Sequence, residues 1–66
     1  MVNTDKLRGI ITEKRKTGQE CAQALGISSQ SFSRKMKKKV FKTDEVEKLV
    51  EFLEIESPLD VFFDFK

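Results

Sequence analysis

Apolar residues recur along the chain at the three- and four-residue intervals of amphipathic helices, and no segment alternates apolar and polar residues convincingly. The first stretch with helical spacing has three apolar residues at i, i+3 and i+4, namely Leu7, Ile10 and Ile11. Asn3 or Thr4 is placed to cap its start. The pattern therefore predicts a first helix that ends near Lys16.

The stretch around Gly26 predicts two helices joined by a tight turn. Thr17 and Glu20 have the spacing of a capping box, in which each side chain accepts a hydrogen bond from the other residue's backbone amide, so a second helix opens at Thr17. Gly26 ends this helix, because glycine adopts the left-handed conformation most readily. Ser28 then caps a third helix only two residues later.

The side chains around this turn have the sizes that two crossing helices require. Ala22, four residues before the glycine, is expected where the helices cross, since a bulky side chain would push them apart. Ile27 fills the angle between the helices, and Phe32 with Met36, one turn apart, anchors the third helix to the core. A helix, a glycine-containing turn and a second helix at this spacing predict a helix-turn-helix.

Two further helices are predicted in the second half of the chain. A fourth helix follows Thr43 and has one apolar face, made of Val46, Leu49, Val50 and Leu53. A short fifth helix opens with Ser57 as its cap, Pro58 at its first position and Asp60 at its third, and runs into Phe62. Residues 1–66 are therefore expected to form a single all-α domain of five helices.

Composition narrows the function that such a domain can have. The chain has 66 residues, 36% of them charged, with one cysteine and no histidine. Neither a zinc site nor a histidine-based catalytic pair can be built from this set, and phosphate-binding glycine motifs are missing. We therefore expect no enzyme activity, no metal and no cofactor. Cys21 is expected to be a small buried hydrophobe rather than a reactive thiol.

The formal net charge of +2 hides a division between the two halves of the chain. Residues 1–42 hold 11 lysine and arginine residues against three acids, a net charge of +8. Residues 43–66 hold two lysines against eight acids, a net charge of −6. A basic cluster alone usually marks a solvated face, but its coupling to the turn pattern favours a nucleic-acid partner.

The turn motif A-x-x-x-G-I-S-x-x-x-F-S, at residues 22–33, resembles the small phage helix-turn-helix regulators of the Cro/CI repressor type. The resemblance extends to LRGII near the start and to LVEFLEI, SPLD and VFF near the end. It is closest to short repressor or modulator-of-repression-like early-gene proteins of Gram-positive temperate phages. It implies a compact five-helix lambda-repressor-like DNA-binding domain, usually dimeric on its operator. Two features depart from the family: Gly18 stands where many relatives have glutamine, and the third helix ends in KMKKKVFK.

Helical geometry then selects the side chains that would read DNA. At roughly 100° per residue, Gln30, Arg34 and Lys37 point away from the direction of Phe32 and Met36. Side chains near the start of a recognition helix reach base edges, and amide and guanidinium groups suit adenine and guanine. The predicted base-reading residues are Ser29, Gln30, Ser33 and Arg34. The predicted phosphate contacts are Thr17, Gln19, Lys35, Lys37, Lys38, Lys39 and Lys42.

Two functions of different classes follow. The first is a sequence-specific transcriptional regulator that reads a double-stranded DNA operator through the third helix. The alternative is an antirepressor or co-repressor that docks on a partner phage repressor, favoured by the acidic second half and by an aromatic tail. In that tail Phe62 is expected to continue the buried side of Leu59, which leaves Phe63 or Phe65 for a homodimer or partner contact. We expect a bacterial cytoplasmic location and neither a membrane nor a small-molecule partner.

Overall fold

The computed structural model describes residues 2–63, and all regular structure within that range is helical. Five helices follow one another: α1 (Thr4–Glu13), α2 (Gly18–Leu25), α3 (Ser29–Lys38), α4 (Thr43–Leu53) and α5 (Pro58–Phe62). The prediction of an all-α chain with five helices is therefore confirmed for the described residues. None of these helices is long and apolar enough to cross a membrane.

The first helix ends earlier than predicted. Asn3 caps its start, where the Asn3 Oδ1 accepts a hydrogen bond from the Lys6 backbone N–H at 3.1 Å. The helix stops at Glu13 rather than near Lys16, because Arg15 takes a left-handed conformation with φ of 58°. The backbone N–H of Lys16 then donates to the carbonyl of Ile11 at 2.9 Å and closes the helix end.

The predicted caps around the turn are confirmed. The Thr17 Oγ1 accepts from the backbone N–H of Glu20 at 3.1 Å, and the Glu20 Oε1 accepts from the Thr17 N–H at 3.0 Å. Gly26 adopts a left-handed conformation with φ of 72°. The backbone N–H of the next residue, Ile27, donates to the Ala22 carbonyl at 3.0 Å. Residues 26–28 therefore suffice to end α2 and to start α3.

Replacing Gly26 with valine should destabilise the domain by more than about 1 kcal/mol. A Cβ at this position meets nothing within 4 Å, so the expected cost arises from forcing a β-branched residue to positive φ and not from a clash of its Cβ. Gly9→Ala is the matched control. A Cβ at Gly9, inside α1, also meets open space, and there alanine should stabilise the helix by about 1 kcal/mol. Urea unfolding of both variants tests this, and an unchanged midpoint for Gly26→Val would contradict it.

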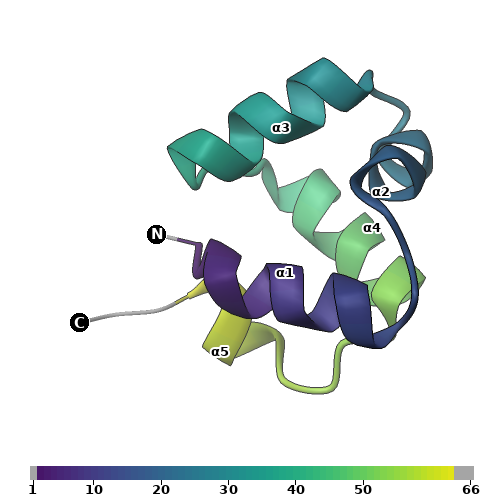
Figure 1. The fold of residues 1–66 in the computed structure, drawn as a ribbon. Helices are drawn as coiled ribbons and strands as arrows, with labels where there is room; N and C mark the ends of the chain where they lie inside the picture. The colour runs from purple at the N-terminus through teal and green to yellow at the C-terminus, as the bar shows by residue number, and fades with distance from the viewer. Residues whose placement is uncertain (1, 64–66) are drawn as a thin grey trace.

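The core lies between two groups of helices. The helix α2 packs against both α3 and α4, and α1 packs against α5. Figure 1 shows α3 along one edge of the molecule and α1 with α5 towards the opposite edge, with α4 between α3 and α1 in this view. Side chains that are almost fully buried come from four of the five helices: Leu7, Cys21, Ala22, Leu49, Leu53 and Val61. The predicted burial of Ala22 and Cys21 is therefore confirmed.

The segment before α1 connects the two groups. The Val2 N–H donates to the Lys39 carbonyl, at the end of α3, over 3.3 Å. The Asn3 N–H donates to the Val61 carbonyl, in α5, over 2.7 Å. The N-terminal segment therefore holds the last turn of α3 beside α5.

The fifth helix buries a different face from the one predicted. We predicted that Leu59 and Phe62 share one buried side of the helix. Leu59 is 70% exposed, so this prediction is wrong for Leu59. The buried residues of this helix are Val61 and Phe62, which are adjacent in sequence. Two neighbouring residues can both be buried because α5 has other elements on two sides: Val61 and Ile10 line one hollow, and Phe62 and Val46 line another. Phe63 is half-exposed, and Phe65 lies outside the described residues.

Cys21 is completely buried and makes no disulfide. Burial raises the pKa of its thiol, the nearby Glu20 carboxylate raises it further, and the Lys16 ammonium opposes them. A thiol with a raised pKa is mostly protonated at neutral pH and nucleophilically weak. Its position therefore fits a packing role.

Candidate nucleic-acid interface

The helix α3 has one buried face and one exposed polar face. Phe32 and Met36 are 4% and 6% exposed, and they attach the helix to the core. The ring of Phe32 lies 5.8 Å from the ring of Phe41, centroid to centroid, so the segment that follows α3 also holds it. Figure 1 shows no other helix on the outer side of α3. The exposed face of this helix is therefore accessible to a large partner.

All four predicted base-reading residues lie on that exposed surface: Ser29, Gln30, Ser33 and Arg34. They occupy the first two turns of α3, and Arg34 follows Gln30 by one turn. Ser28, which caps the helix, accepts a hydrogen bond from the Ser31 N–H at 3.1 Å. Because its side chain is used there, the first exposed serine able to contact a ligand is Ser29.

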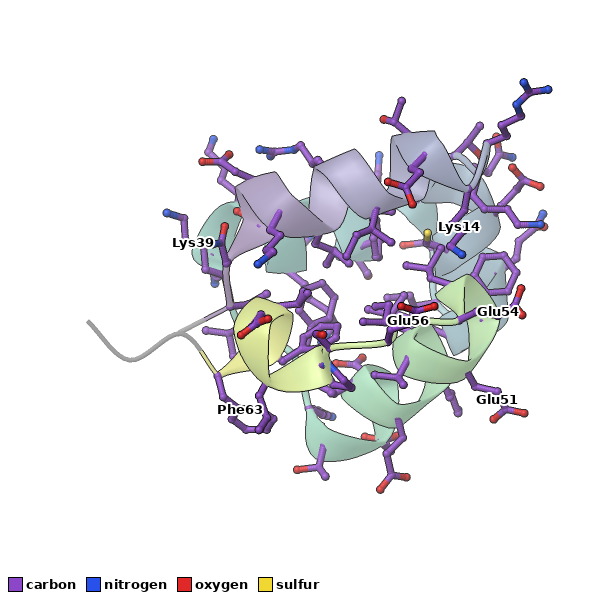
Figure 2. All side chains as sticks on the ribbon, turned by 90° about the horizontal axis from the view of Figure 1, so that it is seen from below. Lys14, Lys39, Glu51, Glu54, Glu56 and Phe63 are labelled. Carbon is purple, nitrogen blue, oxygen red and sulfur yellow. The ribbon has the colours of Figure 1, made fainter. Side chains whose placement is uncertain are left out.

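The basic end of α3 is also exposed. Lys37, Lys38, Lys39 and Lys42 all have exposed side chains. The chain turns sharply at Lys39, whose φ is 60°, so these residues project from the last turn of α3 and from the segment behind it. Figure 2 shows Lys39 at one end of the molecule, and Glu51 and Glu54 towards the other end. The structure thus separates part of the positive charge from part of the negative charge.

Lys35 differs from the other lysines of α3, because its ammonium already has a partner inside the domain. Its Nζ lies 3.2 Å from the Oε2 of Glu45, a side chain that is only 8% exposed. The other carboxylate oxygen of Glu45 accepts from the backbone N–H of Lys42 at 2.8 Å. Glu45 therefore connects α3, the following segment and the start of α4. Lys35 has a structural contact that competes with its predicted contact to phosphate.

Glu45→Ala should lower the free energy of unfolding by about 1–2 kcal/mol, because it removes the cap of α4 and leaves Lys35 unpaired. The ion pair with Lys35 should contribute only a small part of this free energy, because a quarter of the Lys35 side chain is exposed. Glu51→Ala, an exposed change on the same helix, should stay within about 0.5 kcal/mol of the parent. Urea titration measures both, and equal losses for the two variants would contradict the role of Glu45.

The start of α2 lies beside α3 and forms the second part of the candidate interface. A hollow of about 390 Å³ opens there, and its lining includes Arg8, Lys16, Thr17, Gly18 and Ser33. The Thr17 hydroxyl and backbone N–H are both used in the capping box with Glu20. Gln19 is exposed at the first turn of α2, and its side chain takes no part in this capping box. Of the two predicted phosphate contacts here, Gln19 has the more accessible side chain.

Arg8 and Lys16 are two basic residues of this hollow that the sequence-based prediction did not include. Arg8 has an acidic partner close by. Its Nη1 lies 3.4 Å from the Oδ1 of Asp5, and both side chains are largely exposed. Such exposed pairs contribute little and are easily exchanged for another anion. Arg8 and Lys16 thus add positive charge beside α3. Their signal in the sequence was weak, because both lie outside the turn motif at residues 22–33.

Within residues 2–63, no three histidine, cysteine or acidic side chains are grouped so that they could hold a metal ion. The accessible groups of the interface are amides, hydroxyls and cations, which are donors suited to phosphate oxygens and base edges.

A family model described as "Protein of unknown function (DUF739)" matches residues 2–65 of the chain. No curated protein and no solved structure matches it.

Proposed function

The chain belongs to the DUF739 family, and we propose that it is a sequence-specific DNA-binding transcriptional regulator that reads an operator through α3. The observation that carries this proposal is the exposed face of α3, where amide, hydroxyl and guanidinium groups precede a cluster of lysines. The buried Phe32 and Met36 hold this face outward. The resemblance of the turn motif to Cro/CI-type phage regulators supports the same function.

In this proposal α2 and α3 form the helix-turn-helix of a lambda-repressor-like fold. The support is local: a capping box at the start of α2, a left-handed Gly26, and a Ser28 cap at the start of α3. The completely buried Ala22 lets the two helices pack closely, as such a motif requires. The first turns of α3 would enter the major groove, and α2 would lie across the backbone.

Base reading is assigned to the first turns of α3. Gln30 has the paired donor and acceptor that match adenine, and Arg34 has the two parallel donors that match guanine. Ser29 and Ser33 border these two residues and would contact bases or phosphates. Since Gln30 and Arg34 are one helical turn apart, they would read neighbouring base pairs.

Phosphate binding is assigned to the exposed cations around that helix: Lys37, Lys38, Lys39 and Lys42. Gln19 at the start of α2 would add a contact from the other side. We leave Lys35 out of this set, because its ammonium pairs with Glu45. Phosphate contacts fix the position of the protein on DNA, and they make its affinity fall as salt rises.

A gel-shift titration with the DNA that flanks its own gene tests this function. Binding to a specific site there should be about a thousandfold tighter than binding to a random duplex of equal length. Affinity should also fall steeply as salt is raised. Equal affinity for both duplexes would refute sequence-specific recognition, and no binding to either would refute DNA binding.

A second candidate function is a protein-binding modulator that docks on a partner repressor and changes its DNA occupancy. The observation that favours it is the half-exposed Phe63, which borders an apolar groove in the acidic half of the chain. Repeating the gel shift with the repressor present separates the two functions. Altered repressor binding without intrinsic DNA affinity supports the modulator, and intrinsic specific binding supports the regulator.

A further inference from the structure

An apolar groove of about 440 Å³ runs between α4 and α5. Val46 and Val50, one turn apart on α4, line it together with the buried Phe62 of α5. Phe41 and Phe63 also line it, and Phe63 is 47% exposed. Figure 2 shows Phe63 pointing away from α1. The volume falls within the range of about 300–1,000 Å³ that is typical of ligand pockets.

One acidic side chain of α4 lies at the edge of the groove, and two more lie farther around the same helix. Glu47 is one of the groove's lining residues. At about 100° per residue, Asp44 and Glu51 lie within roughly 60° of Glu47 around the helix, on the side that faces away from the buried Leu49. All three acids are exposed, and we call them the acidic row. The groove therefore offers apolar contacts with Glu47 at its edge and further negative charge on the adjoining surface of α4.

The geometry points to a basic amphipathic helix of another protein as the occupant of this groove. Its apolar residues, one turn apart, would pack on Val46, Val50 and Phe63, and its lysines or arginines would face the acidic row. The charge complementarity selects this occupant. A second copy that presented the same face would place one acidic row against another, and like charges across an interface disfavour binding.

The other nearby charges do not change this assignment. The one base within α4 is Lys48, which lies beyond the acidic row when viewed from the groove. Lys39 and Lys42 lie close to the Phe41 end of the groove, so the basic residues of the occupant would face the Val50 end. This inference deepens the second candidate function and does not depend on DNA binding by α3.

Two synthetic helical peptides provide the probe. Both have leucine at i, i+3, i+4 and i+7, and the remaining positions are lysine in one peptide and glutamate in the other. The full chain is titrated with each peptide, and binding is followed by amide chemical shifts and by calorimetry. The lysine peptide should bind at least about tenfold more tightly than the glutamate peptide, with the largest shifts at Val46, Val50 and Phe63. This preference should shrink as salt rises.

Matched variants locate the binding surface. Phe63→Ser should weaken the lysine peptide by about fivefold or more, because it removes an apolar contact at the groove. Leu59→Ser, which removes an even more exposed apolar side chain of α5 outside the groove, should leave the affinity unchanged. Glu47→Gln with Glu51→Gln should reduce the preference for the lysine peptide, whereas Glu54→Gln with Glu56→Gln should not. All four acids are exposed, so each double variant should fold.

Several results would overturn the inference. Equal affinity for the two peptides would refute the charge selection, and shifts confined to other helices would refute the location. Sedimentation of the chain alone tests for a second copy: dimers that Phe63→Ser dissociates would assign the groove to self-association instead. Peptide binding that occurs only after removal of residues 64–66 would assign the groove to the chain's own end. The peptide titration reports on the groove alone, so it can fail independently of the repressor gel shift.

Discussion

Arg34→Ala is expected to weaken binding to the specific operator by about 1–3 kcal/mol, which is roughly fivefold to 150-fold in Kd. The exposed guanidinium, in the second turn of α3, is the group of this helix best suited to two hydrogen bonds with guanine. Its loss should also relax the preference for guanine at one base pair, because those two hydrogen bonds distinguish guanine from the other bases.

Lys38→Ala is the matched change at the basic end of the same helix. It should weaken binding to operator and random DNA about equally and reduce the salt dependence by about one phosphate contact. Anisotropy titrations on the operator, on single-base variants of it and on random DNA, each over a salt series, measure both effects. If both substitutions affected specific and random DNA alike, base reading by Arg34 would be refuted.

Leu49→Ala is expected to cost about 2–5 kcal/mol of stability, the largest effect of any single change considered. Leu49 is completely buried in α4, the helix that packs against α2. A domain of this size has a total stability of only about 3–5 kcal/mol from its core, so this loss should leave much of the chain unfolded at room temperature.

Val40→Ala is the control, since Val40 is 63% exposed and its truncation should change stability by no more than about 0.5 kcal/mol. Urea and thermal unfolding, followed by circular dichroism, compare the two variants with the parent chain. A Leu49→Ala variant that melts cooperatively at the parent temperature would show that α4 contributes little to the core.

The parts of the fold that sequence predicted well depend on signals only a few residues apart. Thr17 and Glu20 contact each other across one turn, and Gly26 needs only its own backbone freedom to end α2. The missed end of α1 has no such signal. Arg15 adopts a left-handed conformation there without the glycine or asparagine that would have marked it. The chain must change direction at Arg15, because α2 begins shortly after it, at Gly18.

The residues of the candidate site divide in the same way, into those that a local pattern predicts and those that depend on contacts between helices. The helical period alone places Gln30, Ser33 and Arg34 opposite Phe32 and Met36, and the structure finds all three exposed. The Lys35–Glu45 pair joins residues ten positions apart on different helices, so no local pattern predicts it. The exposure of Leu59 was missed for a similar reason, because Val61 and Phe62 line hollows with residues of α1 and α4, which no pattern within α5 predicts.

The hydrogen bonds of the N-terminal segment have a consequence for the order in which the chain folds. The contacts of α2 with α3 join neighbours along the chain, and those of α2 with α4 span one intervening helix, so both close over shorter stretches of chain than the bonds of the N-terminal segment. The bonds from Val2 to Lys39 and from Asn3 to Val61 join residues far apart, and the entropy cost of closing a loop grows with its length. Closure of the N-terminal segment is therefore expected late in folding. The end of α3 gains the Val2 contact only after this segment has closed.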